Sequence, residues 1–284
     1  MDHTATDTRS QVVAPERPLI GGMRALLYVG GGFVLVAGLQ LWVFAEHTDA
    51  IFAWTIRSPL TAAYLGSFYW AAAVLALLSA RERTWARARL GVPGVLAFVW
   101  LTLLATVLHL EPFHLDAPDL AAQAAGWVWL AVYVAEPPLL LWAFVAQLRT
   151  AGGDPPRPHP LPRSYRAALA VQAAILLALG AELFVAPGTV GEAWPWGLTE
   201  LTARAIAAWL IALAGLLAAV WWENERSRIR LGLALLLTLV PLQALALARY
   251  GEEVAWSGPG APIMLVLMAG LLATALWGWR SSTG

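Results

Sequence analysis

Long apolar stretches alternate with short polar connections along this chain, and the pattern repeats eight times. The apolar stretches cover residues 24–45, 60–80, 90–110, 121–147, 165–186, 201–222, 229–250 and 262–280. The hydrocarbon core of a bilayer is about 30 Å thick, and a helix needs roughly 20 mostly apolar residues to cross it. The pattern therefore predicts an all-α integral membrane protein with eight transmembrane helices.

Composition supports this class and excludes several kinds of chemistry. The chain is 60% apolar and 13% charged, with a mean hydropathy of +0.65, whereas about a quarter of the residues of soluble domains are charged. It has no cysteine, which excludes disulfides, a thiolate nucleophile and a cysteine-ligated metal. The net charge of zero gives no reason to expect nucleic acid as a partner. No motif identifies a cofactor.

Charged residues in the connections predict how the helices are oriented. All 18 basic residues are arginines, and most lie in the amino-terminal tail, in connections 81–89, 149–166 and 226–230, or after the last span. The remaining connections hold most of the acids, such as Glu46, Glu111 and Glu252. Cytoplasmic loops carry an excess of Lys and Arg. The rule predicts that both termini are cytoplasmic.

The chain also contains an internal repeat. At an offset of 141, residues 60–91 and 201–232 share eleven identities in 32 positions without a gap. The identities include the triplet Leu-Thr-Ala, which occurs at 60–62 and again at 201–203, and the pair of Glu82 and Glu223. One residue of slip pairs 40–42 with 182–184 in the preceding span. Four spans per unit is an even number, so the two repeats should be parallel and related by an axis along the membrane normal.

This duplication predicts a simple domain organisation. Residues 1–22 are polar and form a disordered cytoplasmic tail. Residues 23–149 form the first four-helix membrane repeat, and 164–284 form the second. Between them, 150–163 is a proline-rich cytoplasmic linker that should be semi-extended.

Glu136 is the sharpest candidate for a functional site. It lies near the middle of the fourth span, where a charge costs at least about 2.5–3.5 kcal/mol. Pro137 and Pro138 follow it and remove two backbone donors, which frees carbonyls near Tyr133. A carboxyl beside free carbonyls could bind a cation, a proton or a polar ligand group. The alternative is a protonated side chain hydrogen-bonded to a neighbouring helix. The second half has Leu267 at the corresponding position.

Glu182 and Arg204 are a second candidate. Both lie toward the outer ends of consecutive spans, and their counterparts in the first half are Gln40 and Ala63. The first half therefore lacks both charges. This is expected for an ion pair, because burying one charge without its partner is costly. The pair predicts a structural clamp, and the alternative is an anion site at Arg204.

The outer connections offer two weaker candidates. His109, Glu111 and His114 are acceptable ligand types for a divalent metal, but their spacing matches no known motif, and solvated loop residues are the preferred interpretation. Trp54, Trp194 and Trp196 form a predicted outer aromatic face. Aromatic belts at the membrane interface account for it, and the alternative is an aromatic-lined pocket duplicated by the repeat.

The segment Trp194-Pro-Trp-Gly-Leu-Thr-Glu-Leu-Thr-Ala-Arg204 is similar to a motif of uncharacterised actinobacterial multi-pass membrane proteins. The resemblance covers about a dozen residues per half and is degraded in the first. It implies multi-pass insertion in a bacterial inner membrane and supplies no catalytic residues.

Together these features favour a carrier-like or small-ligand-binding membrane protein that uses Glu136. The alternative is a structural or scaffolding subunit whose outer tryptophans contact lipid, a protein partner or a second copy of the chain. A membrane enzyme ranks third, because no cluster of catalytic groups converges at one depth. Membrane lipids and a small molecule or ion are the expected ligands.

Overall fold

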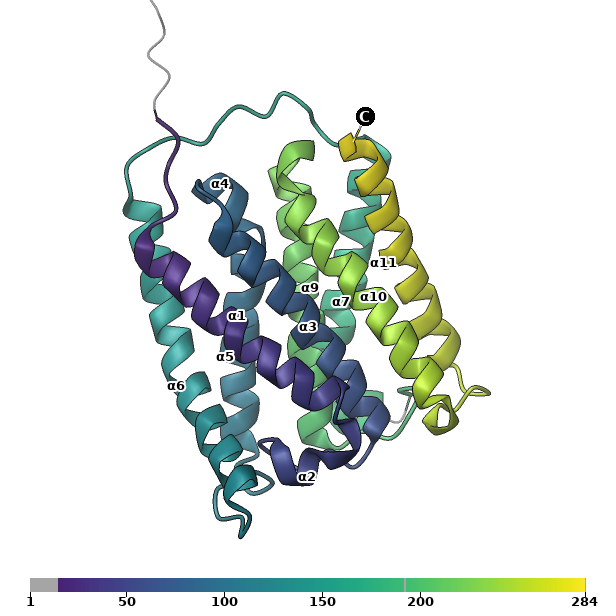
Figure 1. Cartoon of the computed structure of the whole chain (residues 1–284). Helices are drawn as coiled ribbons and strands as arrows, with labels where there is room; N and C mark the ends of the chain where they lie inside the picture. The colour runs from purple at the N-terminus through teal and green to yellow at the C-terminus, as the bar shows by residue number, and fades with distance from the viewer. Residues whose placement is uncertain (1–14, 192, 284) are drawn as a thin grey trace, which may run out of the picture.

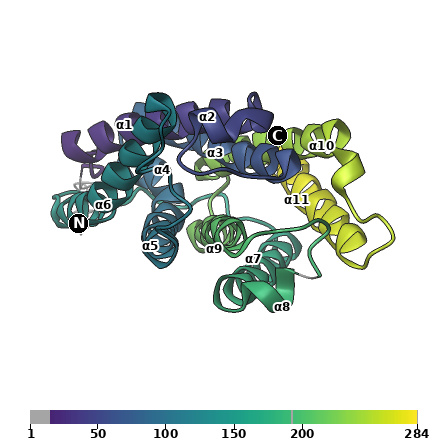
Figure 2. The same cartoon turned by 90° about the horizontal axis from the view of Figure 1, so that it is seen from below.

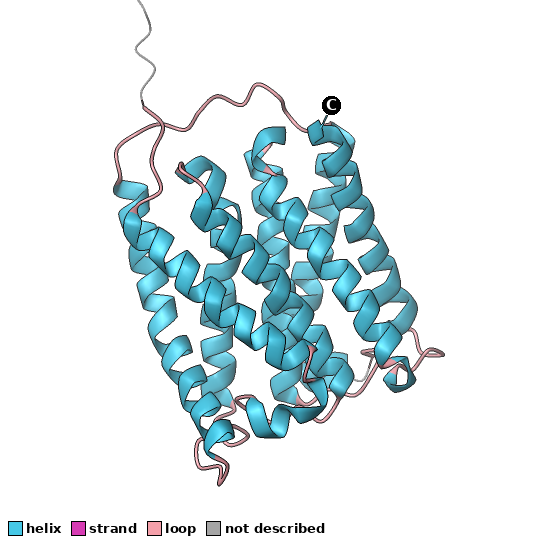
Figure 3. Cartoon of the chain, in the orientation of Figure 1, coloured by secondary structure: helices cyan, strands magenta, loops and turns pink. Residues whose placement is uncertain are grey.

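The computed structural model describes residues 15–191 and 193–283, which fold into a bundle of helices without strands (Figure 3). Eight helical segments of this part of the chain are long and apolar enough to cross a membrane, which confirms the predicted number. They are α1 (Gly21–Trp42), α3 (Pro59–Arg81), α4 (Trp85–Ala88) continuing into α5 (Val92–Leu108), α6 (Leu120–Arg149), α7 (Arg163–Val185), α9 (Glu200–Glu223), α10 (Arg230–Arg249) and α11 (Gly260–Thr283). Shorter helices and 3-10 turns lie between them: η1 (Ala45–His47), α2 (Thr48–Ile51), η2 (Arg89–Gly91), α8 (Pro187–Gly191), η3 (Arg226–Arg228) and η4 (Gly251–Glu253).

Polar residues next to the apolar stretches fix the ends of several helices. Ser58 caps α3 by accepting from the backbone N–H of Thr61, and Asp119 caps α6 in the same way. Thr199 and Thr202 form a reciprocal capping box at the start of α9. These side chains pair backbone donors that the helix itself leaves free. The helix boundaries are therefore set by chemistry that is local in sequence.

Two helices form the centre of the bundle. In α3 and α9, 72% and 67% of the apolar segment is buried, against 22–33% in α1, α6, α7 and α11. Helix α3 packs against α1 and α10, whereas α9 packs against α7 and α5 (Figure 2). Glycines allow the close crossings. A Cβ on Gly38 of α1 would lie 3.1 Å from the backbone nitrogen of Trp70, and one on Gly180 of α7 would lie 3.2 Å from that of Ile211.

The segments that precede α1 and α7 are bound to one end of the bundle, where the C-terminal end of α11 also lies (Figure 1). We call this the arginine end. The backbone N–H of Leu19 donates to Arg83, and that of Trp85 donates to Arg17. Residues 15–22, predicted to be disordered, thus pair their backbone groups with the bundle or begin α1; residues 1–14 lie outside the described residues.

The proline-rich connection 150–162 is likewise held at the arginine end. The N–H of His159 donates to the Glu225 carboxylate, and that of Leu161 donates to the Asn224 side chain. Burial raises the pKa of Glu225, but the N–H of His159 and the N–H and hydroxyl of Ser227 outweigh it, so that the net pKa is lowered. The connection is therefore bound to the bundle at several points and is not a free spacer.

Candidate functional site

A cavity of about 450 Å³ lies between α1, α2, α3 and α6, with Glu136 in its wall. We call it the first cavity. Its polar lining groups are the side chains of Gln40, Tyr69, Tyr133 and Glu136, and the rest of the lining is apolar. Phe33, Val36 and Val128 line it and are 45–55% exposed on the surface of the bundle. The cavity therefore opens between α1 and α6 toward the surroundings of the transmembrane helices.

Glu136 lies where three hollows meet. It also lines a groove of about 280 Å³ on the outer side of the α1–α6 contact and a pocket of about 50 Å³ that extends toward α5. Its carboxyl lies against the backbone of α1, since a Cβ on Gly30 would be 3.0 Å from Oε1. No hydrogen bond or salt bridge to the carboxyl is formed within residues 15–191 and 193–283. Within the described residues, the Glu136 carboxyl therefore does not form the structural hydrogen bond to a neighbouring helix that was the alternative interpretation.

The two prolines after Glu136 lie inside α6, which continues through them to Arg149. Proline has no backbone N–H, so the carbonyls four residues before Pro137 and Pro138 have no helical donor. One of these carbonyls belongs to Tyr133, whose side chain lines the first cavity. The predicted combination of a carboxyl with free carbonyls is therefore present on one helix.

Tyr133 and Tyr69 supply hydroxyl groups to the same cavity. Their hydroxyl oxygens are 3.2 Å apart, and both side chains are buried. The ring of Trp129 packs on Tyr133 with centroids 4.4 Å apart. This aromatic packing fixes the hydroxyl pair, which can donate to a ligand or accept from it. The site can hold an apolar body with a cationic or hydrogen-bond-donating group at Glu136.

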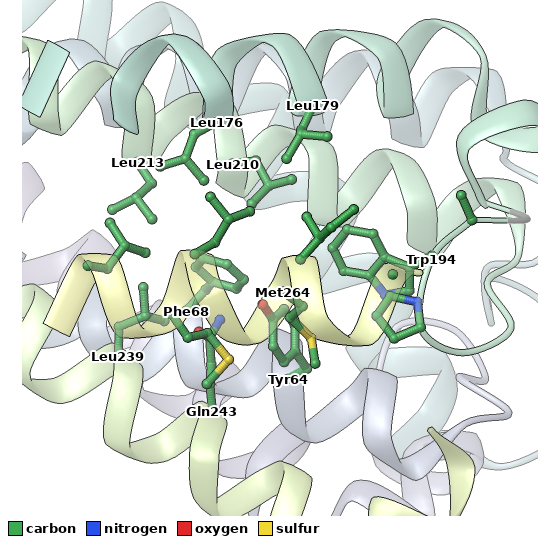
Figure 4. Close-up of a pocket in the computed structure, with 17 residues that line it drawn as sticks. Tyr64, Phe68, Leu176, Leu179, Trp194, Leu210, Leu213, Leu239, Gln243 and Met264 are labelled. Atoms are coloured by element: carbon green, nitrogen blue, oxygen red, sulfur yellow. The ribbon is translucent and has the colours of Figure 1, made fainter. Parts of the chain in front are cut away.

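A second cavity, of about 130 Å³, lies between α7, α9, α10, α11 and α3 (Figure 4). It is lined by apolar side chains together with Tyr64, Trp194 and Gln243. Phe68 of α3 lines it, whereas the next residue, Tyr69, lines the first cavity. Helix α3 is therefore the wall that the two cavities share.

The positions that the sequence pairs between the halves line corresponding parts of the two cavities. Pairs at the offsets of 141 and 142 are Val34 with Leu176, Ala37 with Leu179, Ala53 with Trp194, and Tyr69 with Leu210. The register that pairs Glu136 with Leu267 also pairs Trp129 with Gly260, Val132 with Ile263, and Tyr133 with Met264, and all of these residues line their cavities. Tyr69, Tyr133 and Glu136 of the first cavity are thus replaced by apolar residues in the second, whereas the counterpart of Gln40, Glu182, does not line it.

The ion pair expected between Glu182 and Arg204 is not formed, which corrects that prediction. Glu182 is exposed on α7 and makes no salt bridge within the described residues. Arg204 instead donates to the Glu200 carboxylate, to the carbonyl of Phe184 and to His109 Nε2. An arginine one turn after Glu200 reaches this carboxylate along its own helix. Its guanidinium still links α9 to the end of α7.

The three weak metal candidates are not brought together, and the described residues contain no group of three potential ligands. His109 contacts Arg204, and burial together with this guanidinium lowers its pKa. His114 hydrogen-bonds to Thr55 and to the carbonyl of Phe52, which ties the loop before α6 to the segment after α2. Glu111 is exposed on the same loop. His109 and His114 therefore organise the loops at the end of the bundle opposite the arginine end.

The three tryptophans of the predicted outer aromatic face are in the protein interior or at a cavity. Trp54 is buried and packs against Trp129 with ring centroids 4.9 Å apart. Trp196 is buried and donates from Nε1 to Thr61 Oγ1 at 2.8 Å. Trp194 lines the second cavity. Trp54 and Trp196 are therefore not part of an interfacial belt, and of the three only Trp194 lines either cavity.

Three residues with chemistry of interest were missed by the sequence predictions. Tyr69 and Gln243 are polar residues within apolar spans, a signal that could have identified them. Glu223 was noted only as a repeat match, yet it is buried and accepts from Arg89 and Arg228. Arg89 is distant in sequence from Glu223 and Arg228, and only the fold brings these three residues together.

No family model matches this chain, and no curated protein or solved structure is significantly similar to it.

Proposed function

We propose that the protein is a small-ligand-binding, carrier-like protein of a bacterial inner membrane, built from two parallel four-helix repeats. The repeat is supported by packing at paired positions. Gly38 and Gly180 are 142 residues apart, and the residues that they approach, Trp70 and Ile211, are 141 apart.

Hydrogen bonds at the arginine end follow the same offsets. Trp85 donates to the carbonyl of Arg17, and Arg226 donates to that of His159. Contacts between the proposed halves agree, since α3 packs on α10 and α9 packs on α5. By the positive-inside rule the arginine end is cytoplasmic, which gives cytoplasmic termini. The bacterial inner membrane follows from the resemblance of residues 194–204.

The observation that carries the function is the position of the Glu136 carboxyl. It lies at the junction of three hollows, has no protein hydrogen-bond partner among the described residues, and is reached through an opening between α1 and α6. Placing a carboxyl within the bilayer costs free energy, and an apolar residue could fill a purely structural role without this cost. We infer that Glu136 binds a proton, a cation or the polar group of an otherwise apolar ligand, with the Tyr133 and Tyr69 hydroxyls beside it.

The structural-subunit alternative has less support. It relied on tryptophans that face lipid or a partner, and Trp54 and Trp196 are buried. Membrane lipids remain the surroundings of the exposed apolar faces of α1 and α6.

The test is a flux assay in proteoliposomes that compares wild type with Glu136→Gln. Proton and monovalent-cation fluxes are measured with internal dyes under an imposed gradient. We expect flux above protein-free vesicles in wild type and at least a tenfold decrease in Glu136→Gln. Glu182→Gln is the matched control, because it removes an exposed carboxyl from another span, and its flux should equal that of wild type. Equal, non-zero flux in Glu136→Gln and wild type would exclude the acid from the mechanism. Absence of flux in wild type would favour the structural subunit.

A further inference from the structure

The second cavity has the size and lining of a site for one apolar ring. Its volume is about 130 Å³. An apolar cavity of about 150 Å³ in another protein stays dry and binds benzene. No ionisable side chain other than the Tyr64 hydroxyl lines it, so a charged ligand would lack a counter-charge. Three aromatic rings form part of its wall, with Tyr64 packed edge-on against Phe68 and Trp194 at centroid distances of 5.6 and 6.3 Å.

Two buried donors at this cavity form no hydrogen bond of acceptable geometry within the described residues. Gln243 is 2% exposed and its side chain lines the cavity beside the Tyr64 hydroxyl, but its Nε2 is not positioned to donate to this hydroxyl with good geometry (Figure 4). The indole Nε1 of Trp194, which also lines the cavity, is buried and unpaired in the same way. A buried donor without an acceptor costs roughly 1–3 kcal/mol. Few other polar groups are present to hold water in place, since a buried water usually needs two to four partners.

We propose that the second cavity binds a neutral, ring-sized apolar molecule that carries a carbonyl oxygen, and that Gln243 Nε2 donates to this oxygen. A quinone ring has this chemistry, because it is flat, uncharged and accepts hydrogen bonds at its carbonyl groups. The aromatic side chains contact its faces and edges.

The ligand reaches this site from the membrane. Ile263 of α11 lines the cavity and is 55% exposed, so the cavity extends to the apolar surface of the bundle. This route suits a molecule that partitions into lipid. The site is separate from Glu136, because α3 lies between the two cavities, and it does not depend on the function proposed for Glu136.

The experiment compares 1,4-benzoquinone with benzene, which has a six-membered carbon ring of similar size but no carbonyl. Binding to the full chain in lipid nanodiscs is measured from the increase in Tm with ligand concentration, which gives an apparent Kd. The chain has no cysteine or lysine, so covalent addition of the quinone to these side chains cannot occur. Wild type should bind the quinone about five- to tenfold more tightly than the hydrocarbon, the range expected for one neutral hydrogen bond.

The variant is Gln243→Leu, which removes the donor and keeps a side chain of similar length. It should fold, because it also removes an unpaired buried donor, and it should bind both molecules equally. Gln172→Leu is the control, since Gln172 Nε2 already donates to Thr274 at 2.7 Å and does not line the cavity. It should keep the preference for the quinone, and so should Glu136→Gln.

Three outcomes would overturn the proposal. The first is equal binding of the two molecules to wild type, or binding of neither. The second is a preference for the quinone that persists in Gln243→Leu. The third is a preference that is lost in Glu136→Gln and kept in Gln243→Leu, which would assign the quinone to the first cavity. If Gln243→Leu does not fold, Met264→Trp fills the same cavity and should abolish the binding of both molecules.

Discussion

Replacing Glu223 by Gln should destabilise the protein more than any other single charge removal at the arginine end. Glu223 is 1% exposed, and its carboxylate accepts from Arg89 at 2.8 and 3.0 Å and from Arg228. Arg157 of the connection lies 3.5 Å away, and Arg89 also pairs with Asp154 at 2.6 Å. One carboxylate therefore joins η2, η3 and the connection between α6 and α7.

The expected loss follows from which partners remain. Removing one member of a buried ion pair costs about 3–5 kcal/mol, because the other charge stays buried without compensation. The Arg89 side chain keeps Asp154, and Arg228 keeps the carbonyls of Pro155 and Pro156, which reduces the loss. The contact with Arg157 is partly exposed and adds little. We therefore expect the lower end of the range, about 3 kcal/mol, or roughly 6–12 °C in Tm for a chain of this size.

The assay is thermal unfolding in nanodiscs, followed by intrinsic fluorescence. Glu82→Gln is the matched control, because Glu82 is the sequence-paired position, is only half-buried, and makes no salt bridge among the described residues. Its Tm should change by less than 2 °C. Equal Tm changes in Glu82→Gln and Glu223→Gln would refute the reasoning, since burial and arginine pairing would then not determine the cost.

Two further predictions concern the first cavity and the outer loops. Gly30→Ala should reduce any flux or binding that depends on Glu136, because the new Cβ would be 3.0 Å from its Oε1, whereas Gly32→Ala on the same helix meets nothing within 4 Å and should behave as wild type; equal loss in both would indicate a general effect on α1. The pKa of His109 is lowered by burial and by Arg204, so the stability it contributes is present above the ordinary histidine value of 6.5 and is lost as the pH falls through the lower folded-state value. The Tm of wild type should thus decrease more than that of His109→Gln between pH 7 and pH 5, and parallel curves would contradict this assignment.

The sequence was sufficient to predict the helical architecture, because a membrane span is a local property of about twenty residues. Apolar length sets each span, and the neighbouring Ser, Asp or Thr sets its first turn. The error at residues 15–22 has a physical cause. Their polar composition indicates disorder, but their backbone N–H and carbonyl groups pair with residues near Arg83 and Trp85, which are distant in the sequence.

Some candidate sites were predicted correctly and others were not, because a contact between side chains from different helices is not a local property of the sequence. Glu136 could be identified because a charge within an apolar span is visible in sequence. The Glu182–Arg204 prediction relied on shared depth and on joint absence from the first half, and neither observation fixes the direction of a side chain. Arg204 had a nearer carboxylate one helical turn away, at Glu200. Neither cavity could be predicted, since each requires side chains from at least four helical segments.

Helix α3 separates two cavities that differ in their polar residues. Its consecutive residues Phe68 and Tyr69 face opposite cavities, and both rings contact Trp209 of α9, at 5.6 and 4.9 Å. On the proposed repeat, the glycine crossings are kept in both halves, whereas the polar lining differs, with Glu136 in the first cavity and Gln243 in the second. The glycine positions that match between the halves are those that helix packing requires. The polar positions that differ between the halves are those that can contact a ligand. We infer that the first cavity retains a site for a proton, a cation or a polar group at Glu136, and that the second holds a neutral ring at Gln243.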